Sequence, residues 1–146
     1  MTVYSKDPLW SEWRGTHRVD VVGLGQSAID QVAVVEGPPE FTGKKRIVDL
    51  TQLPGGQIAT GVLACTRLGL SAALVSAVGD DAASRIVLEP LRVAGVDLAG
   101  VRVVPGADSQ LSVIVVDRES GERTVLWHRD SRLSVRVREV RRDDQH

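Results

Sequence analysis

Two stretches in the first half of the chain combine glycines with chemistry that could bind a ligand. Residues 19–30 read VDVVGLGQSAID, an apolar run that passes through Gly23 and Gly25 to the carboxylate of Asp30. Residues 54–56 read PGG and stand directly before a helical pattern. Glycines let a ligand approach the backbone, and the first amides of a helix donate to oxygen ligands. A carboxylate accepts two hydroxyl hydrogen bonds at once, so these parts together would suit a hydroxyl-rich small molecule.

The first stretch also matches the turn of a dinucleotide-binding fold, with Asp49 about 20 residues further on. That fold needs a long helix directly after the turn, whereas residues 29–39 (IDQVAVVEGPP) are rich in β-branched residues and end in Gly-Pro-Pro. We therefore disfavour a nicotinamide-dependent oxidoreductase. Asp30 then either lies at the carboxyl end of a core strand, where open α/β sheets bind ligands, or caps a turn.

The elements that must position these residues follow from hydrophobic periodicity. A helix is predicted after Gly55-Gly56 and is closed by Gly69. Its apolar positions recur at three- and four-residue steps: Ile58, Val62, Cys65 and Leu68. A second helix follows the capping sequence Gly79-Asp80-Asp81 and runs to about Ala94.

Short apolar runs predict strands at residues 19–24, 32–35, 46–53, 72–78, 101–104, 111–117 and 123–128. Strands that alternate with helices predict a parallel sheet covered by helices, while paired short strands predict a small antiparallel β lid beside it. The fold class is therefore α/β. Three core strands and two helices would leave a face of the sheet uncovered, so we expect the chain to stop before a further core strand.

Composition bounds the class of protein. The chain has 146 residues, 42% of them hydrophobic, and a formal net charge of −1, so one domain is expected, with no general attraction to nucleic acid or membranes. No segment reads as a signal peptide or approaches the roughly 20 apolar residues of a membrane span, so a cytoplasmic protein is expected. The single cysteine, Cys65, is predicted as a buried core thiol and excludes a disulfide framework or cysteine-based zinc site within one chain.

Three segments are expected along the chain. Residues 1–18 read as a loosely ordered leader, and residues 19–133 as the folded part, with lid strands at about 31–53 and 111–128. Residues 134–146 read as a charged tail at which a longer protein has been truncated.

These motifs resemble the ribokinase/PfkB family of carbohydrate kinases. Residues 25–30 (GQSAID) are similar to a strand-end motif of that family whose aspartate binds sugar hydroxyls, and residues 54–70 are similar to its Gly-Gly signature and following helix. Residues 73–98 resemble the next strand and helix, and residues 120–128 resemble lid strands. The similarity covers about residues 19–130 and implies a ribokinase-like fold: a partial parallel sheet flanked by helices, plus the lid.

The resemblance implies ATP-dependent phosphorylation of a sugar or nucleoside hydroxyl, with Mg²⁺ accompanying the nucleotide. It implies a substrate-binding set of Asp30, Gly55, Gly56, Gln57, Thr60 and Glu122. For Glu122 and Arg123, however, a solvated hairpin end is favoured over a contact with substrate. Three positions depart from the family pattern and leave the identity of the sugar open: Thr60 replaces an asparagine, Ser84 replaces a glycine, and Ala28 stands where ribokinase has an asparagine.

The catalytic base of the family is the last aspartate of an Asp-Thr-x-Gly-Ala-Gly-Asp motif, and the sequence contains no such stretch. Asp80 and Asp81 are better explained as helix caps. No catalytic, cofactor-binding or metal-binding residue is therefore assigned, and ATP and Mg²⁺ are expected only in a full-length parent. The chain is expected to be the substrate-and-lid half of a kinase, inactive alone.

A second hypothesis is a non-catalytic remnant that binds a sugar or forms a homodimer through the lid. Exposed edges of apolar strands are natural surfaces for pairing. We expect neither nucleic acid nor a membrane as a partner.

Overall fold

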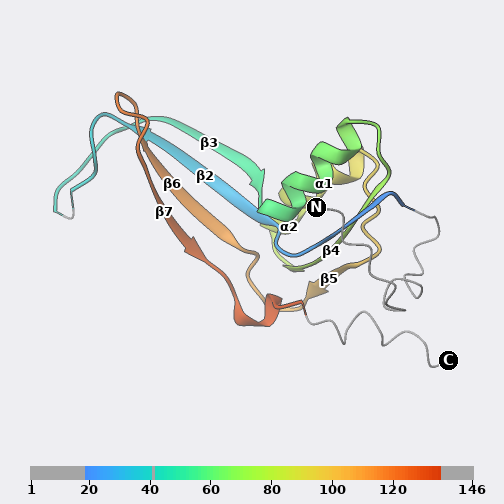
Figure 1. Cartoon of the computed structure of the whole chain (residues 1–146). Helices are drawn as coiled ribbons and strands as arrows, with labels where there is room; N and C mark the ends of the chain where they lie inside the picture. The colour runs from blue at the N-terminus through green and yellow to red at the C-terminus, as the bar shows by residue number, and fades with distance from the viewer. Residues whose placement is uncertain (1–18, 41, 136–146) are drawn as a thin grey trace.

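The computed structural model describes residues 19–40 and 42–135 (Figure 1). The leader predicted at residues 1–18 and most of the predicted tail lie outside these residues. Two sheets make up the fold, and Figure 1 shows the second sheet projecting from the side of the first. No helix within the described ranges is long and apolar enough to cross a membrane.

The core sheet is parallel, as predicted, and has the strand order β1-β4-β5. It consists of β1 (Val21–Leu24), β4 (Ala72–Gly79) and β5 (Val101–Val104). Every residue of the central strand β4 is buried, because neighbours cover both of its edges and both of its faces. A continuous apolar run in the sequence is what such a position requires.

Both helices, α1 (Gln57–Arg67) and α2 (Ala82–Val93), pack on the same face of β4. The buried residues they share with the sheet are Ala59, Val62, Ala72, Leu74, Val78, Leu88, Leu91 and Val96. Leu74 is fully buried, which corresponds to about 2 kcal/mol of transfer free energy. The expected core positions of α1 need correction: Leu68 follows the helix and is 82% exposed, and Cys65 is only partly buried.

The lid is a four-stranded sheet with the order β3-β2-β6-β7. Its strands are β2 (Ala28–Val35), β3 (Ile47–Gly55), β6 (Leu111–Asp117) and β7 (Arg123–His128). The sheet is mixed, because β2 and β6 pair in parallel while the outer pairs are antiparallel. The predicted lid beside the core is confirmed, and two of its three strand pairs are antiparallel as expected, but its inner pair, β2 and β6, is parallel. Since β2 follows β1 and β6 follows β5, both inner strands leave the core from the same edge and run in the same direction.

Asp81 joins the helix α2 to the loop that enters the lid. Its Oδ1 accepts hydrogen bonds from Ser84 N at 3.0 Å and Ser109 Oγ at 2.7 Å, and its Oδ2 accepts one from Ser109 N at 2.8 Å. Gly79 N donates to Ser109 Oγ at 3.0 Å, and a Cβ at Gly79 would lie 2.7 Å from Ser109 N. The predicted capping role of Asp81 is confirmed, and the same carboxylate also fixes the start of β6.

The chain that returns from the lid is also attached to the core. The guanidinium of Arg132 donates to the carboxylate of Asp130 and to Gly106 O, and the side-chain hydrogen bond to Arg132 lowers the pKa of Asp130 to about 2. Leu133, in the short 3-10 helix η2 (Ser131–Leu133), is buried. It packs on the other face of the core sheet with Ala77, Val104 and Ala107.

Replacing Asp81 by alanine should lower the free energy of unfolding by about 1 to 3 kcal/mol, because the helix cap and both bonds from Ser109 are lost. Burial alone would raise the pKa of Asp81, but hydrogen bonds from Ser109 and Ser84 outweigh it and lower the pKa below its ordinary 3.8. The contribution is therefore complete above that ordinary value and is lost as the pH falls through the lowered one. Denaturant unfolding at pH 7 and pH 3 measures this.

The matched control is Glu36→Ala, which removes an exposed carboxylate at the end of β2 and should change stability little. A stability difference between Asp81→Ala and the unsubstituted chain that stays constant between the two pH values would contradict the role given to the ionised carboxylate.

Candidate functional site

The two glycine-bearing stretches meet where the lid leaves the core. β1 passes through Gly25 into β2, and β3 ends at Gly55, which pairs with Ala28. Gly56 then forms the N-cap of α1. Ala59 N donates across this junction to Gln26 O at 3.3 Å, so the start of β2 and the start of α1 are directly bonded.

The carboxylate of Asp30 lies over Gly55. A Cβ at Gly55 would collide with that carboxylate and would stand 2.7 Å from its Oδ1. Asp30 pairs with Leu53, two residues before Gly55, so the aspartate reaches diagonally along the face of the strand pair. Glycine at position 55 is therefore what admits the side chain.

Gly56 brings the backbones together. Its φ is +93°, in the left-handed region, and its Cβ would lie 2.7 Å from Gln26 O and from the Cα of Ser27. Any side chain at this position would therefore combine backbone strain with a collision. A buried hydrogen bond of 3.1 Å between Ser27 Oγ and Ser76 Oγ ties the same segment to the central core strand.

Asp30 is free to accept hydrogen bonds. It lies inside β2 rather than after the core strand β1, and its carboxylate accepts no hydrogen bond from any residue in the described part of the chain. The alternative that Asp30 caps a turn was therefore wrong. Beside it, α1 begins at Gln57, and the amides of a first helical turn point outward as donors. Carboxylate acceptors next to amide donors match the alternating donors and acceptors of a polyol.

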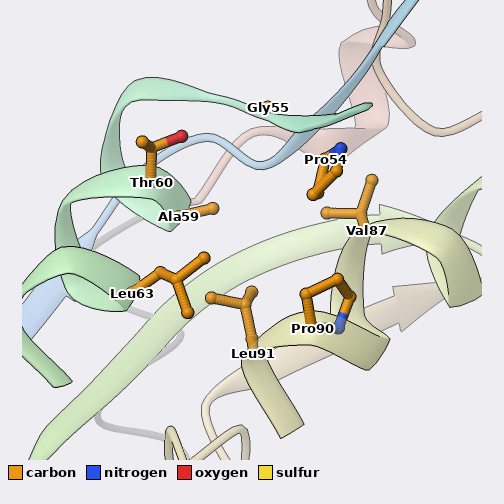
Figure 2. Close-up of a pocket in the computed structure, with 8 residues that line it drawn as sticks. All are labelled: Pro54, Gly55, Ala59, Thr60, Leu63, Val87, Pro90 and Leu91. Atoms are coloured by element: carbon orange, nitrogen blue, oxygen red, sulfur yellow. The ribbon is translucent and has the colours of Figure 1, made fainter. Parts of the chain in front are cut away.

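Gln57 and Thr60 are exposed residues on the first turns of α1. Figure 2 shows that Thr60 borders a small hollow between α1, α2 and the end of β3. The hollow is otherwise lined by Pro54, Gly55, Ala59, Leu63, Val87, Pro90 and Leu91. Asp30 is not part of this lining, so the structure does not bring Thr60 and Asp30 into one pocket.

Glu122 lies in the turn at the tip of the lid. Its backbone oxygen accepts a hydrogen bond from Asp117 N at 2.9 Å. The pairing of β6 with β7 places Trp127 in the row of Asp30 and Arg123 four residues away from that row, which is about 13 Å along the strand. Within this chain, Glu122 is therefore not brought to Asp30.

The strand register adds neighbours that the sequence did not indicate. Asp30 pairs with Leu53 on one side and Ser112 on the other, and Ser112 pairs with Trp127. These four residues form one row across a single face of the lid, and Trp127 is 69% exposed at its edge. The short apolar runs at residues 111–117 and 123–128 gave the hairpin, but the choice of β2 as the parallel partner of β6 had no sequence signal.

No group of three or more histidine, cysteine, aspartate or glutamate side chains within residues 19–40 and 42–135 could hold a metal ion.

Comparison with known proteins identifies relatives of this arrangement. The model of the pfkB family carbohydrate kinases matches residues 18–143. The ATP-dependent ribose-1-phosphate kinase of Halopiger xanaduensis is 34% identical over 108 residues, which cover 74% of this chain and 36% of that protein. Fructokinase-1 of Oryza sativa subsp. japonica is 34% identical over 110 residues, which cover 75% of this chain and 32% of that protein.

Among solved structures, a protein of Agrobacterium tumefaciens that is provisionally assigned as a ribokinase matches with a TM-score of 0.70 and 34% identity. The match covers 77% of this chain and 37% of that one. The chain thus spans about a third of the length of the relatives that it matches.

Gly56→Ala should lower the free energy of unfolding by about 2 kcal/mol or more, because alanine is strained at φ +93° and its Cβ meets the backbone of residues 26–28. Gly61→Ala is the matched control, since it lies inside α1 with no neighbour within 4 Å of the added Cβ. That control should be neutral or stabilising by up to about 1 kcal/mol. Equal effects of the two substitutions in denaturant unfolding would refute the close approach at Gly56.

Proposed function

Because the chain belongs to the pfkB family of carbohydrate kinases, we propose that it forms the part of such a kinase that binds the hydroxyl-bearing substrate. The observation that supports this most strongly is the unpaired carboxylate of Asp30, held over Gly55 beside the start of α1. The reaction proposed for the whole protein is ATP-dependent phosphorylation of a hydroxyl group on a sugar or nucleoside.

In this proposal the residues of the chain orient the substrate. Asp30 accepts hydrogen bonds from two hydroxyl groups, and the amides of Gln57 and Ile58 at the start of α1 donate to substrate oxygens. Gly55 and Gly56 contribute backbone rather than side chains. Thr60 lines the separate apolar hollow, and contacts of Thr60 and Glu122 with substrate stay predictions. Fixed orientation matters because phosphoryl transfer depends mainly on positioning and charge stabilisation.

The nucleotide, with its Mg²⁺ ion, supplies the phosphoryl group when bound. The sequence has no Asp-Thr-x-Gly-Ala-Gly-Asp stretch, and the described residues contain no side-chain cluster that fits a metal ion. We assign no step to a nucleotide on this chain. The relatives are about three times as long as the region that matches this chain. We propose that the nucleotide site and the catalytic base belong to the remaining parts of such a kinase.

Asp30→Ala should weaken sugar binding by about 1.5 to 3 kcal/mol, which is about 10- to 150-fold in Kd, because charge-assisted hydrogen bonds are lost. Isothermal titration calorimetry with D-fructose, D-ribose and ribose 1-phosphate measures this. Asp49→Ala is the control, since it removes a carboxylate from the adjacent strand β3, opposite Val34 and away from the row of Asp30.

An unchanged affinity in Asp30→Ala would remove Asp30 from the site. With ATP and Mg²⁺ added, the chain should bind sugar without forming ADP, and sugar-dependent ADP formation at ordinary kinase rates would contradict the assignment of transfer to parts outside this chain.

A second candidate function, pairing through the lid, is favoured by its exposed apolar residues. Leu50, Leu126 and Trp127 are 63%, 60% and 69% exposed. The strands β3 and β7 that carry them are the edges of the sheet within the described chain. Unprotected edges and apolar faces of this kind favour association, and we propose a second copy of the chain as the partner, with each lid covering the other.

Val125→Lys and Leu126→Lys place a charge on opposite faces of the lid, because neighbouring residues of a strand point to opposite sides. At least one of them should convert a dimer into a monomer in sedimentation velocity. Leu68→Lys, at an 82% exposed position after α1, is the control and should leave the dimer intact. A monomeric unsubstituted chain would contradict the proposal.

A further inference from the structure

Gln110 lies at the base of the lid, directly before β6. Its Oε1 is shielded from solvent and has no hydrogen-bond partner. Among the residues that the structure describes, no other buried side-chain nitrogen or oxygen lacks a hydrogen-bond partner. Buried polar atoms are nearly always paired, because an unmade hydrogen bond costs free energy. The unpaired acceptor is therefore a hydrogen-bonding capacity that the described residues leave unmet.

The amide of Gln110 is oriented by a second glutamine. Gln110 Nε2 donates to Gln26 Oε1 at 3.4 Å, which joins the two segments through which the chain enters the lid. This bond uses the donor side of the Gln110 amide and leaves Oε1 as its free end. Gln26 belongs to the same short segment whose backbone Gly56 packs against.

The strand register places Gln110 next to the row of Asp30. Gln110 O accepts a hydrogen bond from Ile29 N at 2.9 Å, and the parallel pairing then continues with Ile29 opposite Leu111. Extending the same register by one residue sets Gln110 opposite Ala28, which itself pairs with Gly55. Because side chains alternate along a strand, Gln110 falls on the face that carries Asp30 and Ser112.

The distance between the two acceptors suits one small ligand. Gln110 and Asp30 lie on adjacent strands and two residues apart along them, so their backbones are about 8 Å from one another. Ala28 lies between them and carries only a methyl group, which is buried. Two acceptors at this separation would hold two hydroxyl groups of one polyol.

We infer that Gln110 determines substrate specificity: its Oε1 accepts a hydrogen bond from a second hydroxyl group of the polyol that Asp30 holds. This inference rests on the proposed function. A hydroxyl or amino group at that substrate position supplies the donor. A deoxy position or a phosphate dianion supplies none, so the site discriminates against both.

Gln110→Leu removes the acceptor while nearly preserving side-chain size. For whichever of D-fructose, D-ribose and ribose 1-phosphate binds the unsubstituted chain most tightly, it should weaken binding by about three- to tenfold. One single-deoxy analogue of that sugar should lose the same affinity toward the unsubstituted chain and lose nothing further toward Gln110→Leu. Gln31→Leu is the matched control, because Gln31 follows Asp30 on β2 and points to the other face.

The outcomes separate this inference from the proposed function. Equal affinities of Gln110→Leu and the unsubstituted chain, with binding still weakened in Asp30→Ala, would overturn the role of Gln110 alone. Deoxy analogues that all lose affinity equally toward both proteins would do the same. Absence of sugar binding by the unsubstituted chain would overturn the proposed function and this inference with it. If circular dichroism shows Gln110→Leu to be unfolded, Gln110→Met removes the same acceptor.

Discussion

The close approach of the Asp30 side chain to Gly55 and of the backbone to Gly56 is the constraint on which the rest of the structure depends. A side chain at Gly55 would occupy the place of the Asp30 carboxylate, and one at Gly56 would collide with the backbone of residues 26–28. The absence of two Cβ atoms therefore lets the end of β3, the start of β2 and the start of α1 share one small volume. The acceptor at Asp30 and the donors at the start of α1 are neighbours for that reason.

The direction in which the lid strands leave the core is set at this junction. β2 and β6 leave the core side by side and pair in parallel, so residues of both strands form common rows on one face. Asp81 fixes the entry to β6 through Ser109, while Arg132 and Leu133 fix the exit from β7. The lid is thus attached to the core at each of its connections, and its polar base, with Asp30, Ser112 and Gln110, is held at the edge where β1 ends.

The sequence predicted where helices and strands lie better than it predicted which strands pair with one another. Short apolar runs located β6 and β7 at the residues observed, and capping chemistry located the start of α2 at Asp81. Leu68 was misassigned because periodicity does not show that a helix ends one residue earlier. The parallel pairing of β2 with β6 is a contact between segments about 80 residues apart, and no local signal specifies it. Gln110 and Trp127 became candidates only once that register was known.

The most direct test of the account is to locate the bound substrate on the chain by NMR. Titration of the ¹⁵N-labelled chain with the sugar that binds most tightly should shift the amides of Gln57, Ile58 and Ser112 and the side-chain amide of Gln110, while Leu63 and Val87 stay unchanged. Shifts confined to the apolar hollow around Leu63 and Val87, or to the lid tip around Glu122, would contradict a substrate site built on the two glycines.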